Sequence, residues 1–236
     1  MTWSIIARDE RTGNLGIAVA SKFFAVGACV PYIASGIGAI ATQALLNSLY
    51  GTHGLNLLRD GMPPEDTVRH LTADDAGRDH RQLHVMDARG RIAAHTGSGC
   101  VPWCGHIEER QLSIAGNMLA GPAVLGETAA AYRANAKLPF AQRLVAAMQA
   151  GERAGGDKRG KQSAALVIYG AEDWPDLDLR VDDHPDPLAE LGRLETVSQE
   201  YFIHFRKFLP RRDDPVGIID RRAIEAEIAK SAGAKG

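Results

Sequence analysis

The order of extended and helical segments most constrains the fold of this chain. Two apolar runs, Trp3 to Arg8 and Leu15 to Ser21, are joined by a polar, glycine-containing stretch that is typical of a β-hairpin. Helical spacing follows, then more strands, two helices, two more strands and a last helix. Strands and helices do not alternate strictly. This order favours an α+β fold with stacked antiparallel sheets flanked by helices over a doubly wound parallel sheet.

The ends of the helical segments give further expectations. Helical spacing begins at Leu45, so Gln43 and Asn47, four residues apart, are expected to share one helix face. A long helix is expected from Pro187 to Leu209. We therefore expect one domain over residues 1–210 and a charged, helical tail over residues 211–236.

Composition limits the class of protein. The chain has 236 residues, 45% of them hydrophobic, and a formal net charge of -2, which argues against nucleic acid or a membrane surface as the partner. No apolar run approaches the roughly 20 residues of a membrane-spanning helix. No secretory signal is recognisable, and three cysteines do not make a disulfide framework. These features lead us to expect a cytoplasmic protein.

Thr2 is the first candidate for a catalytic residue. It follows Met1, and methionine aminopeptidase generally removes an initiator methionine that precedes a small residue. Thr2 would then carry a hydroxyl and a free α-amine, which together supply a nucleophile and a base. An α-amine titrates at roughly 7.7–8.0 and is partly unprotonated near neutral pH. A threonine in an ordinary first strand is the alternative.

Lys22 and two amide side chains extend this candidate site. Lys22 ends the second strand of the hairpin, where its cation would lie beside Thr2 and stabilise an alkoxide. A solvated lysine at a strand end is the alternative. The side chains of Gln43 and Asn47 suit a substrate amide or carboxylate, although Asn47 also suits the cap of a helix.

Two glycine-containing strand ends offer groups that bind an anion. His95, Thr96 and Gly97 end one strand in a hydroxyl-rich turn, where backbone N–H groups would bind an oxyanion. Gly116 permits a close backbone approach, and the next residue, Asn117, supplies an amide donor. Each stretch is equally compatible with a turn that binds no ligand.

Two charged turns complete the candidates for substrate binding. Asp157 lies in a glycine-rich stretch before a strand, where it would reach a site or pair with Arg159. Asp183 lies among several carboxylates after a strand, and these would bind a cation or a cationic substrate group. The same segment also fits the cap of the helix that follows.

Two other motifs partly match cofactor-binding patterns but lack features that those patterns require. Gly36 to Ala41 matches the loose dinucleotide pattern G-x-G-x-x-A, but the run continues as an extended segment where a helix should begin. Cys100, Cys104 and His106 lie within seven residues, but structural zinc needs four ligands and no second pair has a matching spacing. We therefore expect neither a metal nor another cofactor.

Several segments together resemble the DUF1028 family, which is placed among the N-terminal-nucleophile (Ntn) hydrolases. The resemblance extends over roughly Met1 to Leu191. The segments that carry it are Met1-Thr2-Trp3-Ser4-Ile5, Ala18 to Phe23, Ala41-Thr42-Gln43-Ala44, Gly116-Asn117 with Leu119-Ala120-Gly121-Pro122, Gly156-Asp157 with Arg159-Gly160 and Gln162-Ser163-Ala164-Ala165, and Asp178 to Pro187. The resemblance implies a four-layer α-β-β-α sandwich with two stacked, mainly antiparallel sheets, a Thr2 nucleophile and an amidohydrolase activity.

The sequence thus leads to one hypothesis and one alternative. The hypothesis is an amidohydrolase that acts on a small-molecule amide, with Thr2 as nucleophile and Lys22 and Asn117 assisting it. The alternative is a non-catalytic binding or sensor protein on the same scaffold. Helices rich in alanine and leucine, at Pro122 to Gly151 and Pro187 to Leu209, favour a homodimer; packing of these faces on the sheets is the alternative.

Overall fold

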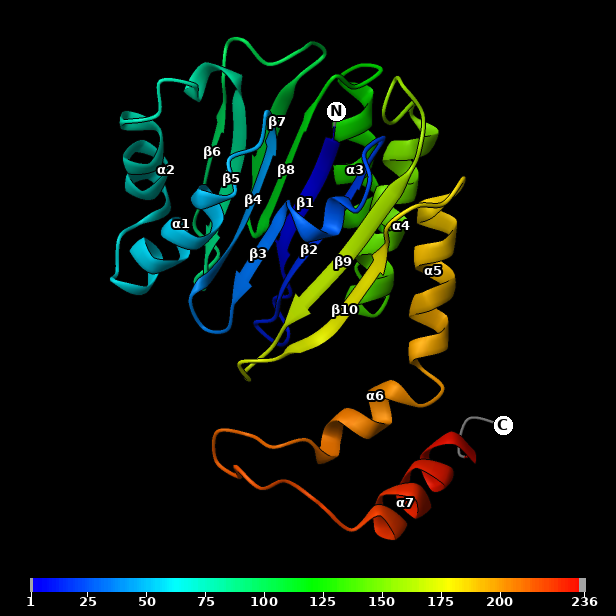
Figure 1. Cartoon of the computed structure of the whole chain (residues 1–236). Coiled ribbons are helices and arrows are strands. Elements are labelled where there is room, and N and C mark those ends of the chain that lie inside the picture. Colours follow the sequence, from blue (N-terminus) through cyan, green and yellow to red (C-terminus); the bar gives the residue numbers. More distant parts are fainter. Residues whose placement is uncertain (1, 234–236) are drawn as a thin grey trace. The chain divides into compact units, whose positions relative to one another are not determined.

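The computed structural model describes residues 2–233, and the chain divides into two compact units, Met1–Leu191 and Gly192–Gly236. The division falls within helix α5 (Pro187–Ser198), as can be followed along the ribbon in Figure 1. The boundary expected after residue 210 therefore lies inside the second unit.

Ten strands form two antiparallel sheets in the described part of the first unit. The larger sheet has the order β10-β9-β2-β1-β8-β7 and the smaller sheet the order β3-β4-β5-β6. The strands are β1 (Thr2–Arg8), β2 (Leu15–Ser21), β3 (Pro31–Ala34), β4 (Gly38–Ala44), β5 (Arg81–Asp87), β6 (Ile92–Thr96), β7 (Gly105–Glu109), β8 (Leu112–Asn117), β9 (Ser163–Tyr169) and β10 (Pro175–Val181).

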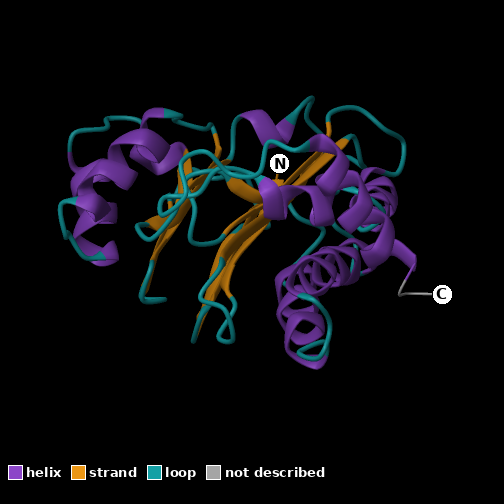
Figure 2. Ribbon diagram, turned by 90° about the horizontal axis from the view of Figure 1, so that it is seen from below, coloured by secondary structure: helices purple, strands orange, loops and turns teal. Residues whose placement is uncertain are grey.

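Helices cover the outer face of each sheet. α1 (Leu49–Arg59) and α2 (Pro64–Ala73) pack on the four-stranded sheet, and α3 (Ala123–Ala134) and α4 (Phe140–Arg153) pack on the six-stranded sheet. The sheets meet through β1 and β8 on one side and β4 and β5 on the other. Figure 2 shows the two sheets side by side, with α1 and α2 beyond the smaller one. The expected fold class, an α-β-β-α sandwich, is confirmed.

The strands are apolar because both faces of each sheet are covered. All seven residues of β2 are buried, as expected for a strand between a helical layer and a second sheet. Helix α4 buries Phe140, Leu144 and Met148, which are spaced by one turn and face β2. Gly16 of β2 permits this contact, because a Cβ there would lie 2.7 Å from the Leu144 Cδ1 atom.

Two strands, β3 and β7, were not expected, and one expectation about the first helix was wrong. Gln43 and Asn47 do not share a helix face, because Gln43 lies in β4 and α1 begins only at Leu49. Between them Ala44 has a φ of 71°, a left-handed conformation that cannot continue into a right-handed helix.

The single helix expected from Pro187 to Leu209 is also wrong. α5 ends at Ser198 and is followed by the short α6 (Phe202–Phe205), while α7 (Arg221–Gly233) lies in the tail, where a helix was expected. At the end of α5 the Ser198 hydroxyl donates to the Glu195 carbonyl and competes with the helical ladder. Tyr201 then has a φ of -132°, which interrupts the helix.

None of the helices within residues 2–233 has the length and apolar character needed to cross a membrane.

Candidate active site

Thr2 begins β1, the strand between β2 and β8 in the larger sheet. Its side chain is buried, and the residue is only 7% exposed. The Thr2 Oγ1 atom lies 3.1 Å from the Oγ atom of Ser21, its register partner in β2. On the other side Asn117 of β8 points its Nδ2 atom at the Thr2 carbonyl oxygen, 3.5 Å away. A hydroxyl and a carboxamide therefore flank Thr2. Met1, whose removal the hypothesis requires, lies outside the described residues.

The Thr2 side chain faces the space between the sheets. Alternate residues of a strand share a face, so Thr2 and Ser4 point the same way. The Ser4 hydroxyl donates to Gln43 Oε1 over 2.8 Å and lies 2.8 Å from His84 Nε2, and both partners belong to the smaller sheet. The hydroxyl of Thr2 thus opens toward the interior between the sheets and away from the α3–α4 layer.

Gln82 connects this interior network to the residues beside Thr2. Its Oε1 atom accepts one hydrogen bond from Gln43 Nε2 over 2.8 Å and another from Asn117 Nδ2 over 3.0 Å. Its Nε2 atom donates to the Thr96 hydroxyl over 2.9 Å and to the Gly116 carbonyl oxygen over 2.9 Å. Gln43, Thr96, Gly116 and Asn117, all candidates from the sequence, therefore meet around one amide that the sequence analysis did not single out.

His84 extends the network farther into the sandwich. Its two ring nitrogens lie 2.8 Å from the hydroxyls of Ser4 and Ser113. The side chain is completely buried, and burial lowers its pKa from 6.5 to about 3, with a smaller contribution from His106. His84 is therefore neutral near neutral pH, and the whole network between the sheets carries no charge.

Asp157 fixes the chain that follows Ser21. Its carboxylate accepts the backbone N–H of Lys22 over 2.8 Å, and its other oxygen accepts the backbone N–H of Arg159 over 2.8 Å. The Arg159 guanidinium lies 3.2 Å away and pairs with it. The Asp157 side chain is only 2% exposed, so its oxygens are occupied by donors of the protein itself.

Lys22 and Asp183 lie at the same end of the sandwich and bind neighbouring loops. The Lys22 side chain is exposed, and its Nζ atom donates to the carbonyl oxygen of Lys161 over 3.1 Å. Asp183 is exposed and accepts a hydrogen bond from Gln162 Nε2 over 3.2 Å. Their roles toward Thr2 and toward a substrate stay predictions.

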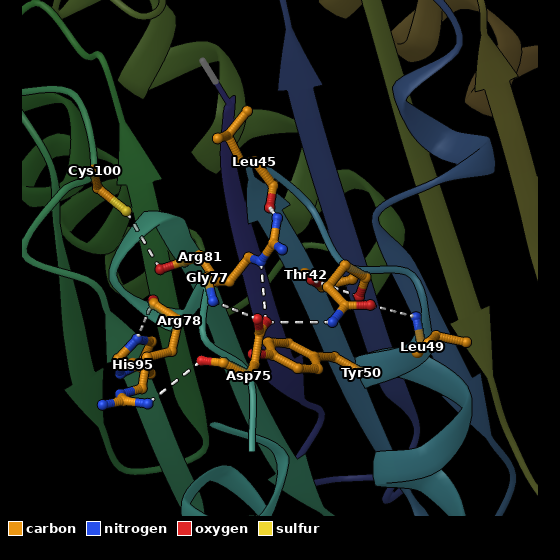
Figure 3. Close-up of polar contacts among 11 residues, drawn as sticks. Thr42, Leu45, Leu49, Tyr50, Asp75, Gly77, Arg78, Arg81, His95 and Cys100 are labelled. Atoms are coloured by element: carbon orange, nitrogen blue, oxygen red, sulfur yellow. Dashed lines mark hydrogen bonds and ion pairs between the residues drawn. The ribbon is translucent and has the colours of Figure 1, made fainter. Parts of the chain in front are cut away.

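A second polar cluster centres on Asp75, in the loop before β5. Figure 3 shows its carboxylate beside Tyr50, Gly77 and Arg81, all of which donate hydrogen bonds to it. The Tyr50 hydroxyl donates over 2.6 Å and the Arg81 Nε atom over 3.1 Å. The Tyr50 hydrogen bond, more than any other contact, lowers the pKa of Asp75, so the carboxylate is ionised. Burial, followed by the Asp75 contact, raises the pKa of the Tyr50 phenol above its usual value.

Asn47 belongs to this second cluster. Its Nδ2 atom lies 3.4 Å from Asp75 Oδ2, and its Oδ1 atom accepts the N–H of Leu49, the first residue of α1. Asn47 also lines a groove of about 570 Å³ whose other walls include Tyr50 and Asp75. Asn47 thus binds the backbone at the start of α1, whose N-cap is Ser48, and its role toward a substrate stays a prediction.

The turn after β6 is tied to the start of β5. His95 Nε2 lies 2.9 Å from the carbonyl oxygen of Arg78, and the Gly97 N–H donates to the Arg81 carbonyl oxygen over 3.0 Å. The backbone N–H of Gly97 is therefore occupied. Figure 3 shows the contact of His95 with Arg78. Of the two oxyanion sites expected from the sequence, the one at Gly116 and Asn117 is adjacent to Thr2.

The cysteines do not converge with His106. Cys100 donates from Sγ to the Arg81 carbonyl oxygen over 3.3 Å, and Cys104 donates from Sγ to the Cys100 carbonyl oxygen over 3.6 Å. His106 Nδ1 lies 2.9 Å from the Thr96 hydroxyl. Within residues 2–233 no group of three or more His, Cys, Asp or Glu side chains is arranged to hold a metal ion.

Ser4, Gln82, His84 and Ser113 were not predicted from the sequence, although one signal marks three of them, Ser4, Gln82 and His84. Thr2 and Ser4 alternate in one apolar strand, and Gln82 and His84 alternate in another. Polar residues at every second position of a fully apolar strand mark a polar patch on one buried face.

Known proteins resemble this chain to different degrees. Residues 2–191 match DUF1028, a family of unknown function. The crystal structure of protein SPO2555 from Silicibacter pomeroyi, also DUF1028, superposes with a TM-score of 0.87 at 36% identity, over 93% of this chain and 96% of that chain. Anbu (ancestral beta-subunit) from Yersinia bercovieri gives a TM-score of 0.41 at 12% identity, over 84% and 97% of the two chains. A TM-score of 0.41 does not establish a shared fold. No curated protein matches the sequence.

Proposed function

This chain belongs to the DUF1028 family, and we propose that it is an amidohydrolase that uses Thr2 as an N-terminal nucleophile on a small amide. The observation that carries the proposal is the placement of Thr2. Its hydroxyl is buried at the start of the central strand, 3.1 Å from the Ser21 hydroxyl, and the Asn117 amide lies on its other side. Thr2 thus combines a nucleophilic hydroxyl with a neighbouring amide donor, the groups that the proposed reaction needs besides the α-amine.

The proposed reaction uses groups that lie on or next to Thr2. After removal of Met1, the Thr2 hydroxyl attacks the amide carbonyl and the free α-amine takes its proton. Asn117 donates to the oxyanion that develops on the carbonyl oxygen. The α-amine returns the proton to the leaving nitrogen, which departs as an amine. Water then hydrolyses the ester on Thr2 and restores the hydroxyl.

Backbone conformation supports a site at this end of the sandwich. Among the described residues, four that are not glycine have a positive φ, and three of them follow strands at the Thr2 end: Ala25 after β2, Ala44 at the end of β4, and Met118 after β8. Such conformations cost about 1–3 kcal/mol each and cluster at functional sites.

Exposed apolar side chains around the Thr2 end of the sandwich favour a substrate that carries an apolar group. Among residues 2–191 the exposed large hydrophobic side chains are Phe23, Phe24, Leu45, Leu49 and Val101. The two phenylalanines follow Ser21, the partner of Thr2. Leu45 follows β4, and the Val101 carbonyl accepts the N–H of Met118, next to Asn117. Apolar surface gathered around a nucleophile suits an acyl or aryl group of the amide.

The proposal is tested on protein expressed in its native host. Intact mass should show that Met1 is absent, because an acylated Thr2 nitrogen cannot serve as the base. The protein is then treated with p-nitrophenyl acetate, a simple acyl donor, and the modified residue is mapped by peptide mass. Neutral hydroxylamine removes an ester from the Thr2 hydroxyl but leaves an amide on the α-amine.

A hydroxylamine-sensitive acetyl group on Thr2 supports the proposal. A preparation that turns over amide substrates while it retains Met1 would overturn it. So would processed protein that is acetylated on surface lysines but never on the Thr2 hydroxyl. The latter result would favour the alternative, a small-molecule binding protein on the same scaffold.

A further inference from the structure

We infer that Gln82 is a positioning residue that aims one N–H of the Asn117 amide at Thr2. This inference rests on the proposed function, because it assigns Gln82 a role through the Asn117 oxyanion donor. The side chain of Gln82 is completely buried and lies in the smaller sheet, opposite Thr2 and Asn117.

The hydrogen-bond pattern fixes the orientation of the Gln82 amide. Its Oε1 atom accepts from Gln43 and Asn117, while its Nε2 atom has three oxygen acceptors: the Thr96 hydroxyl at 2.9 Å, the Gly116 carbonyl at 2.9 Å and the Gly105 carbonyl at 3.1 Å. A flipped amide would place an NH₂ group against two other NH₂ groups, and an oxygen against these acceptors. Only one orientation satisfies the buried donors and acceptors.

A series of hydrogen bonds, in which each side chain donates to the next, supports this orientation of the Gln82 amide. Ser4 donates to Gln43 Oε1, so its oxygen accepts from His84 Nε2–H. In a neutral imidazole the other nitrogen, Nδ1, is then the acceptor, and it receives the Ser113 hydroxyl. The series therefore runs from Ser113 through His84 and Ser4 to Gln43, and Gln43 donates to Gln82.

Asn117 has two amide hydrogens, and Gln82 uses one of them. The Asn117 Nδ2 atom lies 3.0 Å from Gln82 Oε1 and 3.5 Å from the Thr2 carbonyl oxygen. The second distance exceeds the 2.7–3.2 Å of a well-formed N–H···O bond. The second hydrogen is therefore directed at Thr2 but only weakly engaged, which leaves it available to an oxyanion formed there. Without Gln82 the Asn117 amide would lose the contact that sets its rotation.

The test measures the rate at which p-nitrophenyl acetate acylates the Thr2 hydroxyl, as the initial burst of p-nitrophenolate. Asn117→Ala should slow the burst on the order of 10²–10³-fold, the usual effect of losing one oxyanion donor. Gln82→Leu should slow it by about 10- to 100-fold, because the donor remains but is misplaced. Leu83→Val is the matched control, since Leu83 follows Gln82 in β5 and is equally buried, but its side chain packs on the opposite face of the sheet in an apolar cluster with Ile40 and Tyr50. Its burst should equal that of the wild type.

The double variant Gln82→Leu/Asn117→Ala separates positioning from a general structural effect. If Gln82 acts through Asn117, adding Gln82→Leu to Asn117→Ala should slow the burst no further. A wild-type burst in Gln82→Leu, or an equal loss in both backgrounds, would overturn the inference about Gln82. A wild-type burst that Thr2→Ala leaves unchanged would instead overturn the proposed function.

Gln82→Glu provides a second test if Gln82→Leu does not fold. In this variant a protonated carboxyl group keeps a donor for the Gly116 carbonyl, whereas an ionised carboxylate places a negative oxygen against it. The ratio of the Gln82→Glu burst to the wild-type burst should therefore rise as the pH falls, and taking the ratio also cancels the titration of the α-amine. A ratio that does not change with pH would contradict the positioning role.

Discussion

The space between the two sheets has two ends of opposite character. Along the inner face of β1 the side chains change from Thr2 and Ser4 to Ile6, and along β5 from Gln82 and His84 to Met86. Polar side chains meet across the sheets at one end. Toward Ile6 and Met86, and also beside the polar side chains on β2, β4 and β9, aliphatic side chains form one cluster, the aliphatic end: Ile6, Leu15, Ile17, Val19, Val26, Val30, Ala39, Ala41, Met86 and Ala165.

The two ends contribute differently to the protein: the aliphatic end mainly stabilises the fold, and the polar end mainly orients side chains. Aliphatic burial contributes roughly 25 cal/mol for each Å² removed from water, and it needs no particular orientation. A buried polar group is costly unless every donor and acceptor is paired, and a paired network holds its members in one arrangement. The polar end therefore stabilises the fold less per side chain than the aliphatic end does, but it fixes the orientation of the groups around Thr2.

Thr2→Ala should give the largest effect at the polar end. The burst of p-nitrophenolate released from p-nitrophenyl acetate should fall by about 10³-fold or more, because the nucleophile is absent. Thr2→Ser should retain part of the rate. The melting temperature of Thr2→Ala should stay close to that of the wild type, because the side chain makes one hydroxyl contact. An unchanged rate of ester formation would place the nucleophile elsewhere.

Ile6→Ala should give the opposite result on the same face of the same strand. Because Ile6 is completely buried in the aliphatic cluster, the free energy of unfolding should fall by about 2–5 kcal/mol, as measured by urea denaturation. Thr2 acylation in the remaining folded protein should not change. The control is Ile219→Ala, since this side chain is 83% exposed and should alter stability by less than about 0.5 kcal/mol. Equal losses in the two variants would argue against the aliphatic end as the source of stability.

A smaller effect is expected from the titration of His84. Burial lowers its pKa in the folded protein to about 3, against 6.5 in the unfolded chain. Between these values the unfolded chain binds a proton that the folded protein does not, so stability decreases as the pH falls from 6.5 toward 3. The slope that His84 contributes is at most about 1.4 kcal/mol per pH unit, and it vanishes above pH 6.5.

His84→Gln removes this titration but keeps a neutral polar side chain. Urea denaturation at several pH values from 4 to 7 should show a shallower loss of stability in His84→Gln than in the wild type. The difference between the two proteins isolates His84 from the carboxylates that titrate in the same range. Parallel pH profiles would mean that water reaches His84 in the folded state.

Local sequence pattern was enough to predict the hairpin, the class of fold and the position of Thr2. Alternation and glycine-containing turns specify strands through contacts between neighbouring residues. Pattern alone did not find β7 (Gly105–Glu109), a short edge strand in which exposed and half-buried residues alternate. The apolar spacing from residue 187 to 209 did not reveal the break after Ser198, where Tyr201 has a φ of -132°.

The amino-acid sequence therefore shows which strands are apolar and that a hydroxyl stands at the start of the first one. Gln82 meets Gln43, 39 residues away, and Asn117, 35 residues away, only in the folded protein. Such contacts depend on the register of each sheet and on how the two sheets stack. These are set by the sum of many distant contacts, and no local window of the sequence contains them.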